Sequence, residues 1–320
     1  MIRACLRALA LLSLAACGAA QAQGDAFPSK PIRLVVCCTG FPEAVSRVVA
    51  EAITEATKAQ VVIDPKPGAN GILAAEYVAK SPPDGYTVLI GTNSTHAANQ
   101  TLYKQLNYDY VKDFVPISAL SQGALMLAVN PNLPAKSVAE LTALAKKDPG
   151  KLTYGYASSS TRAAMEQYKQ MAGISIQDVP YKTLPQATTD LLGGRIDLMI
   201  GDMVSLPPQV QSGKLRGLAV TGPKRMASFP DLPTMNEAGV TGYVLTFWLG
   251  VWAPAGTPAP VVQKLNEMVT AALRSPKVIE FLVKAGSEPF PTSSAELMKF
   301  QVSEQQKWNK ILTTAGIQPE

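Results

Sequence analysis

The chain has 320 residues, of which 47% are hydrophobic and 17% are charged, with 29 basic and 24 acidic side chains. This composition excludes a disordered chain, and the length allows two domains that each bury their own core. One histidine and four cysteines exclude a multi-histidine metal centre, and the scattered basic residues give no reason to expect a nucleic-acid partner.

The N-terminus has the order of residues found in export signals. Two arginines precede an uncharged stretch over residues 8–16, and small and then polar residues follow. The apolar stretch is much shorter than the roughly 20 residues that a membrane-spanning helix needs. We therefore expect residues 1–22 to be a signal peptide, or residues 1–16 to be a lipoprotein signal that leaves a lipid on Cys17. Either way, the mature protein is expected outside the cytoplasm, in the periplasm.

Short runs rich in Val, Ile and Leu alternate with helical patterns from residue 32 onward, which is typical of sheets covered by helices. In the first series, the predicted strands are 32–36, 61–63 and 87–90, and the predicted helices are 44–56 and 72–80. In the second series, the predicted strands are 125–129, 152–156, 196–200 and 215–220, and the predicted helices are 138–147, 163–171 and 205–212. The C-terminal region is predicted to form helices over 261–273, 277–284 and 295–314.

Two long extended stretches, at residues 114–129 and 243–253, interrupt this alternation. We interpret them as paired crossovers between two α/β lobes with parallel-rich sheets and flanking helices. Lobe 1 is predicted to hold residues 27–122 and 247–320, and lobe 2 residues 123–246. Two lobes joined in this way form a hinge with a cleft between them, as in binding proteins that close on a ligand. A single Rossmann-type enzyme is the competing architecture, but its glycine fingerprint is missing.

Cys37 and Cys38 are adjacent at the end of the first predicted strand. Consecutive Cα atoms lie about 3.8 Å apart, below the usual disulfide range, so we expect no structural disulfide. We interpret the pair as small apolar residues, and a redox or metal-binding pair is the alternative.

The residues that several enzyme classes need are missing from the sequence. A Ser-His-Asp hydrolase would have to use His96, yet no GxSxG motif is present. A pair of Cys37 or Cys38 with His96 would lack a third residue to orient it. Neither GxxxxGK[ST] nor GxGxxG occurs, so the sequence contains no recognisable nucleotide-binding loop for nucleotide-dependent catalysis. We expect no enzyme activity, no metal and no cofactor.

Polar residues follow the predicted strands where the strand ends of both lobes face one cleft. Hydroxyls and free N–H groups at helix N-termini bind carboxylates, although plain helix capping is the alternative for residues 158–161. Arg162 is expected to clamp an anion or face solvent, and Asp202 to accept from a ligand or cap a turn. The candidate ligand-binding residues are Thr39, Gly40, Phe41, Glu43, Thr92, Asn93, Thr95, His96, Ser158, Ser159, Ser160, Thr161, Arg162 and Asp202.

A series of motifs in one order carries a family resemblance over nearly the whole mature length. They include PSKPIRLVV at 28–36, KPGANG at 66–71, SPPDGYT at 81–87, GTNSTHA at 91–97 and APAGTP at 253–258. Through them the chain resembles the Bug-type extracytoplasmic solute receptors of tripartite tricarboxylate transporters (TTT). The resemblance implies a two-lobed, type II-like periplasmic binding protein that clamps a small organic acid and delivers it to a membrane permease. It implies no catalysis and no cofactor.

Two loops depart from the family pattern where the ligand is expected. Residues 37–43 are shorter than the family's Pro- and Gly-rich loop, with Glu43 near its acidic position. Residues 156–162 lack the family's glycines, and Arg162 stands where a His is expected. These changes suit a larger or aromatic acid, with Phe41 and Trp248 as candidate walls, unless both aromatics belong to the core. Altered or lost binding is the other interpretation.

The predicted function is therefore capture of a small organic anion in an interlobe cleft by a monomeric periplasmic receptor. Its predicted partners are the anion and the TTT permease subunits. An exported ligand sensor of the same fold is the alternative, and an exported hydrolase is a more distant one.

Overall fold

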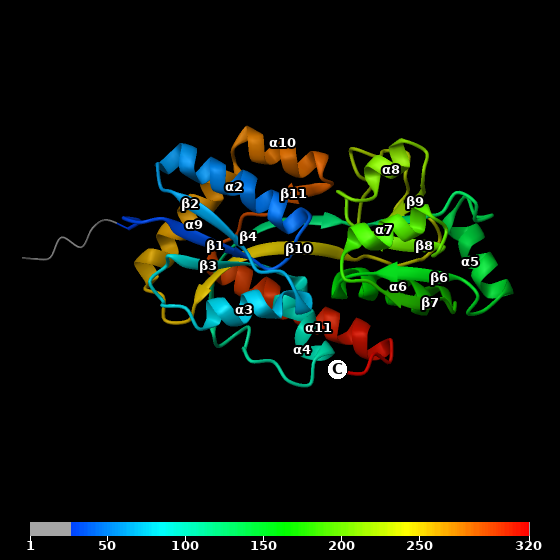
Figure 1. The fold of residues 1–320 in the computed structure, drawn as a ribbon, viewed down its shortest axis with the longest axis horizontal. Helices are drawn as coiled ribbons and strands as arrows, with labels where there is room; N and C mark the ends of the chain where they lie inside the picture. The colour runs from blue at the N-terminus through cyan, green and yellow to red at the C-terminus, as the bar shows by residue number, and fades with distance from the viewer. Residues whose placement is uncertain (1–26, 320) are drawn as a thin grey trace, which may run out of the picture.

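The computed structural model describes residues 27–319 and has two lobes joined by long strands (Figure 1). The predicted signal segment, with Cys17, lies outside these residues. Within residues 27–319, no helix is long and apolar enough to cross a membrane. Each lobe is built on one sheet with helices packed on it, as the alternating sequence pattern predicts.

The first lobe contains a six-stranded sheet with the strand order β11-β4-β10-β3-β1-β2. In this sheet, β1 pairs in parallel with β2 and β3, whereas β10 pairs antiparallel with β3 and β4, and β11 antiparallel with β4. The strands are β1 (Ile32–Val36), β2 (Val61–Pro65), β3 (Thr87–Thr92), β4 (Phe114–Ala124), β10 (Thr246–Pro254) and β11 (Ser287–Pro289).

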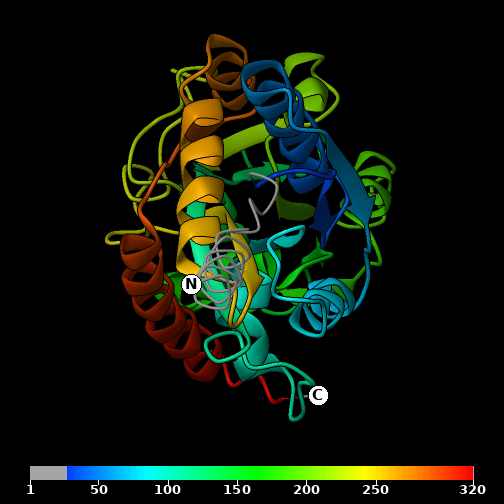
Figure 2. The ribbon, with the colours of Figure 1, turned by 90° about the vertical axis from the view of Figure 1, so that its left-hand side faces the viewer.

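Helices cover both faces of this sheet. Figure 1 shows α2 and α10 above it and α3 and α11 below it, and Figure 2 shows these layers end-on. In α2, Val45, Val49 and Ile53 are buried one turn apart, which gives the helix an apolar side toward the sheet. The helical segments of this lobe are α2 (Phe41–Thr57), η2 (Ala69–Gly71), α3 (Ile72–Ala79), the π-helix η3 (Ser94–Ala98), α4 (Asn99–Leu102), α9 (Ala259–Leu273), α10 (Pro276–Lys284) and α11 (Ser294–Thr314).

The second lobe contains a five-stranded sheet with the order β7-β6-β8-β5-β9. Here β6 pairs in parallel with β7 and β8, and β5 pairs antiparallel with β8 and β9. Its strands are β5 (Met126–Val129), β6 (Thr153–Tyr156), β7 (Gln177–Pro180), β8 (Leu198–Gly201) and β9 (Arg216–Val220). Its helices are α5 (Val138–Lys147), α6 (Ser159–Ala172), α7 (Leu184–Leu192) and α8 (Pro207–Gln211).

Both sheets are mixed, which corrects the expectation of parallel-rich sheets. The antiparallel pairs involve β4, β5 and β10, the strands that carry the chain from one lobe to the other and back. β4 and β10 run in opposite directions and pair antiparallel with each other, whereas β5 pairs antiparallel with β8 and β9 in the second sheet. Among the other elements, β1 and α5 have the predicted bounds, whereas β7, α7 and β11 are not among the predicted elements.

The predicted crossovers are present and lie side by side. β10 pairs with β4 along its whole length, from Thr246 opposite Ala124 to Pro254 opposite Phe114. Beyond Leu125, the chain of β4 enters the second sheet directly as β5. The two lobes are therefore connected through one antiparallel ribbon at the centre of the molecule.

Two tryptophans fix this ribbon to the C-terminal helix. Trp248 and Trp252 on β10 are fully buried, and their indole N–H groups donate to Glu304 and Gln301 of α11 at 2.8 and 3.0 Å. The Trp308 indole donates to the same Glu304 carboxylate at 3.1 Å. Because buried polar groups without partners are costly, these bonds fix the position of α11 against the crossovers.

Near Leu125 and Leu245, where the chain passes between the lobes, both segments are hydrogen-bonded to Thr221, just after β9. The backbone N–H of Leu125 donates to Thr221 Oγ1 at 2.8 Å, and the N–H of Thr221 donates to the carbonyl of Leu125 at 2.9 Å. The N–H of Leu245 donates to the carbonyl of Thr221 at 2.9 Å. One buried threonine, just after β9, thus joins the two chain segments that pass between the lobes.

We predict that Thr221→Val destabilises the protein by about 1–3 kcal/mol, because the buried N–H of Leu125 loses its acceptor. Thr221→Ser keeps the hydroxyl, so its free energy of unfolding should fall by clearly less than that of Thr221→Val. Urea unfolding of the three proteins measures the difference. Equal losses for the valine and serine variants would show that the hydroxyl contributes nothing.

Candidate functional site

The loop between β1 and α2 presents an open helix N-terminus. Thr39 and Gly40 are exposed, and α2 begins at Phe41 with no side-chain cap. Gly40 has φ 79° and ψ −131°, a conformation that only glycine adopts readily. The N–H groups of Phe41 and Glu43 have no partner within the helix, because the first turn of a helix leaves its donors free.

The loop between β6 and α6 holds a second helix N-terminus. Ser158 caps α6: its Oγ accepts from the N–H of Thr161 at 3.4 Å, and Thr161 Oγ1 accepts from the N–H of Ser158 at 3.3 Å. Helix capping, the alternative interpretation for residues 158–161, is therefore what the structure shows for these two residues. The helix begins at Ser159, earlier than the predicted start at residue 163.

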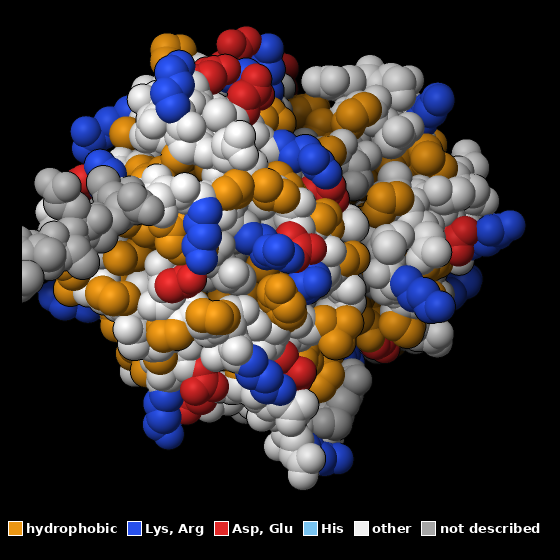
Figure 3. Space-filling model, turned by 60° about the vertical axis from the view of Figure 1, so that its left-hand side comes forward, with side chains coloured by type: hydrophobic (Ala, Val, Ile, Leu, Met, Phe, Trp, Pro, Cys, Tyr) orange, Lys and Arg blue, Asp and Glu red, His pale blue; other side chains and the backbone are white. Residues whose placement is uncertain are grey.

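The predicted loops of the two lobes meet across the boundary between the lobes. Asn93, just after β3, donates from Nδ2 to Ser160 Oγ at 2.5 Å. A Cβ atom placed on Gly40 would lie 3.7 Å from Asp202 Oδ2, so the β1–α2 loop faces the loop after β8. We call these four residues, Gly40, Asn93, Ser160 and Asp202, the interlobe site. Figure 3 shows the two lobes as separate masses with an indentation between them.

The two carboxylate oxygens of Asp202 face different lobes. Oδ1 accepts from the N–H groups of Val204 and Ser205 at 3.0 and 2.7 Å, which is the turn-capping role that the sequence left open. Oδ2 is the oxygen that faces Gly40. The first oxygen therefore fixes the side chain, and the second remains directed at the opposite loop.

The start of α6 also carries unused hydrogen-bonding capacity. Ser159 is buried, and its Oγ has no hydrogen-bond partner in the part of the chain that the structure describes. Its backbone N–H and that of Ser160 belong to the first helical turn and lack intrahelical acceptors. A hydroxyl and two N–H groups at the positive end of a helix suit an oxygen-rich anion.

His96 is a core residue, not part of the interlobe surface. Its ring is fully buried and stacks on Trp252 with 3.8 Å between ring centroids, and its Nδ1 lies 2.8 Å from Thr95 Oγ1. Burial lowers the pKa of His96 to about 3, so the ring is neutral. Thr95 Oγ1 also accepts from the N–H of Thr92 at 2.9 Å, so both threonines serve the turn after β3.

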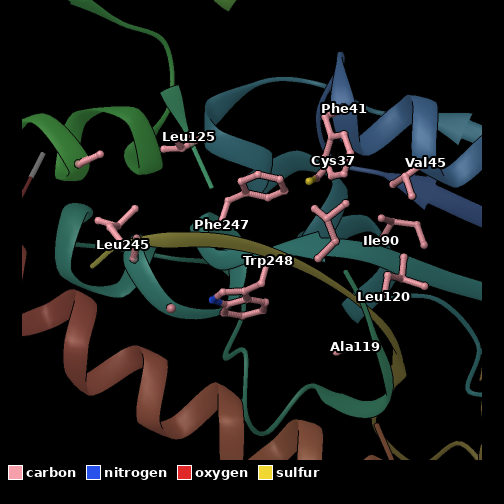
Figure 4. Packing of buried hydrophobic residues seen from close by; sticks show 14 of the residues in the cluster. Cys37, Phe41, Val45, Ile90, Ala119, Leu120, Leu125, Leu245, Phe247 and Trp248 are labelled. Atoms are coloured by element: carbon pink, nitrogen blue, oxygen red, sulfur yellow. The ribbon is translucent and has the colours of Figure 1, made fainter. Parts of the chain in front are cut away.

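The predicted aromatic walls are packed in the core. Trp248 is fully buried against α11, and the Phe41 ring packs edge-on to Phe247 with centroids 5.0 Å apart. Figure 4 shows Cys37, Phe41 and Phe247 among the buried apolar side chains of the first lobe. The core interpretation therefore holds for Trp248, and Phe41 lies beneath the interlobe site instead of lining it.

The predicted charged residues are paired within their own lobes. Arg162 lies 3.7 Å from Asp178 and places its guanidinium 5.1 Å from the centre of the Tyr156 ring. Glu43 accepts from Arg47 at 2.6 Å, one turn along α2. No group of three His, Cys, Asp or Glu within residues 27–319 is arranged to hold a metal ion. The interlobe site is thus built mainly from backbone, hydroxyl and amide groups.

A second contact between the lobes involves residues that the sequence reasoning missed. Gly286, in the turn between α10 and β11, packs so closely on Met203 and Met226 that an added Cβ would meet Met226 Cε at 2.1 Å. Nearby, Lys224 pairs with Glu288 at 2.9 Å. A glycine after a helix is a usual C-terminal signal, and nothing in its sequence context indicates a contact with the other lobe.

Two cavities lie away from the interlobe site. One of about 230 Å³ is bounded by both lobes beside the crossovers, and its lining includes Gln122, Lys224 and Glu288. The other, of about 460 Å³, lies on the first lobe and is lined by residues such as Tyr103 and Asp109. None of the predicted ligand-binding residues lines either cavity. The lobes are in contact at Asn93, and Gly40 faces Asp202 of the other lobe.

The family model described as "Tripartite tricarboxylate transporter family receptor" matches residues 45–317. Rpa4515 from R. palustris, solved with adipate, is 37% identical, with 92% of this chain and 100% of that chain covered and a TM-score of 0.87. The periplasmic binding protein BugD is 30% identical, with 92% and 100% covered and a TM-score of 0.84. MatC from Rhodopseudomonas palustris, with bound malate, is 28% identical, with 89% and 100% covered and a TM-score of 0.81. The family and the two-lobed α/β fold predicted from the sequence are confirmed, with mixed sheets in place of parallel-rich ones.

We predict that the buried neutral His96 makes the protein less stable in mild acid. The folded pKa is about 3 and the ordinary value is 6.5, so protons bind the unfolded chain preferentially below pH 6.5. The contribution of His96 to the free energy of unfolding is therefore fully present above pH 6.5 and is lost as the pH falls toward 3. At pH 5 the loss is about 2 kcal/mol. Urea unfolding at pH 7 and pH 5 measures this loss.

His96→Phe is the matched control, because it keeps an aromatic ring against Trp252 and removes the titration. Since the chain has one histidine, most of the difference between pH 7 and pH 5 should disappear in this variant. A variant with an unchanged pH dependence would assign the loss to other groups.

Proposed function

We propose that this protein, which belongs to the tripartite tricarboxylate transporter receptor family, binds a small organic carboxylate between its two lobes. The observation that carries this proposal is that one helix N-terminus of each lobe faces a loop of the opposite lobe at the interlobe site. Gly40, before α2, faces Asp202, and Asn93 contacts Ser160 in the first turn of α6. Free N–H groups at helix starts bind carboxylate oxygens without a fixed positive charge.

The chemistry of the site favours a carboxylic acid with a second polar group. The N–H groups at the starts of α2 and α6 would take carboxylate oxygens, and Ser159 Oγ adds a donor. Asp202 Oδ2 would repel a bare carboxylate placed against it but would accept from a hydroxyl or ammonium group. The similar proteins solved with adipate and with malate support a dicarboxylate or hydroxy-acid ligand.

Closure of the lobes is the proposed mechanism. The moving bodies would be residues 27–122 with 247–320, and residues 123–246. They would turn about Leu125 and Leu245, where both connections between the lobes are hydrogen-bonded to Thr221. Ligand contacts from both lobes stabilise only the closed arrangement, and that difference in contacts drives the shift. The Asn93–Ser160 bond belongs to this closed arrangement.

The family also suggests where the receptor acts and what it serves. We propose that it works in the periplasm and delivers its bound acid to the membrane permease of a tripartite tricarboxylate transporter. No catalytic step is part of this proposal.

We expect dicarboxylates to raise the melting temperature of the purified protein. A ligand at a hundred times its Kd stabilises the folded state by about 2.7 kcal/mol. A thermal-shift panel should contain adipate, malate, succinate and benzoate at equal ionic strength, with sodium chloride as control. Malate should exceed succinate, because its hydroxyl can donate to Asp202. If no acid shifts the melting temperature more than the salt does, carboxylate binding at this site is wrong.

We expect Gly40→Ala to raise the Kd of the best acid about tenfold. An alanine avoids φ 79°, so the free loop relaxes to another conformation, and binding must restore the original one at a cost of roughly 1–2 kcal/mol. Gly173→Ala is the matched control: Gly173 ends α6 at φ 62°, and nothing lies within 4 Å of its added Cβ. Calorimetric titration should show unchanged affinity for Gly173→Ala. Equal effects of the two substitutions would place the binding elsewhere.

A further inference from the structure

Two thiols lie in contact directly before the interlobe site. Cys37 Sγ and Cys38 Sγ are 3.0 Å apart, at the end of β1 and one residue before the exposed Thr39 and Gly40. Both are free thiols. This short distance between two nucleophilic sulfurs is not used in the proposed binding mechanism.

The two thiols differ in access. Cys37 is fully buried, and Gly71 packs so tightly on it that an added Cβ would lie 2.9 Å from Cys37 Cβ. Cys38 is only half-buried. The hydrogen bond with Cys38, together with burial, raises the pKa of the Cys37 thiol, so this group stays protonated until a base removes its proton. A reagent from solvent can therefore reach only Cys38.

We propose that Cys37 and Cys38 are a reversible modification site, at which a small-molecule disulfide such as oxidised glutathione converts the two thiols to a vicinal disulfide. An exported chain meets oxidising conditions in which such a reaction can proceed. Neighbouring cysteines close a strained ring, and strained disulfides are the ones that thiols reduce readily. The strain that argues against a permanent structural disulfide thus favours a reversible one.

The reaction balances in two exchange steps. The Cys38 thiolate attacks one sulfur of the small disulfide, the S–S bond of the reagent breaks, and one small thiolate leaves and takes up a proton. Cys37 sulfur, 3.0 Å away, then attacks Cys38 sulfur and loses its proton. The second small thiolate leaves and takes up that proton. The protein loses two electrons and two protons, and the reagent becomes two thiols.

The modification would act on the interlobe site through the backbone. Closing the ring constrains the peptide between Cys37 and Cys38, and the chain then reaches Gly40 within two residues. Gly40 caps α2 and faces Asp202, so a shifted loop changes both the N–H groups and the facing distance. We therefore expect weaker carboxylate binding in the oxidised protein, a consequence that rests on the proposed function.

The test uses a chain in which Cys5 and Cys17 are serine, so that the pair supplies all its thiols. The protein is incubated with oxidised glutathione, and the peptide that contains both cysteines is analysed by mass spectrometry. We expect a loss of two hydrogen atoms and no bound glutathione, reversed by reduced glutathione. Cys37→Ala, the matched control, should instead accumulate glutathione on Cys38, and Cys38→Ser should not react.

Binding is measured separately on the reduced and oxidised forms, with the acid that gives the largest thermal shift. The affinity should fall at least about fivefold on oxidation and recover on reduction, while Cys38→Ser shows no change. A glutathione adduct that persists on wild-type Cys38, or two thiols that remain unreacted, would overturn the proposal. If the internal disulfide forms but the protein binds no acid, the modification site is supported and the proposed carboxylate-binding function is wrong.

Discussion

Two buried indole N–H groups fix the central strand β10 to the C-terminal helix α11. Trp248 and Trp252 on β10 donate to Glu304 and Gln301 on α11, and all four side chains are buried. Removing either acceptor would leave a buried donor without a partner, at a cost of about 1–3 kcal/mol. Since β10 also pairs with β4 along its length, these bonds fix both connections between the lobes to one helix.

The interlobe site depends on this fixed ribbon. The strands that precede its loops are β1 and β3 in one sheet and β6 and β8 in the other, and the chain passes between these sheets from β4 into β5 and back into β10. The helix α11 also reaches the second lobe, where Gln170 donates to the carbonyl of Ile311 at 3.4 Å. These contacts hold the two lobes in an arrangement in which Asn93 of one lobe donates a hydrogen bond to Ser160 of the other.

The sequence predicts the repeating elements well because their apolar residues follow a clear period. β1 and α5 have the predicted bounds, whereas β7 has mostly exposed residues and α7 begins with Leu-Pro and contains two threonines, so neither has a strong pattern. At the site, the run of serines before residue 163 indicates a loop, yet it forms the first turn of α6. Burial of His96 and the contact of Gly286 with Met203 depend on which elements pack together, and no local pattern encodes that.

All three tryptophans of the chain lie in the cluster formed by β10 and α11, and Glu304 accepts from two of them. None of them belongs to the interlobe site. The tryptophan fluorescence of the protein therefore reports on the ribbon that joins the lobes and, through the His96 ring stacked on Trp252, on the segment after β3. A change in tryptophan emission without unfolding would therefore report a rearrangement within the cluster of β10 and α11.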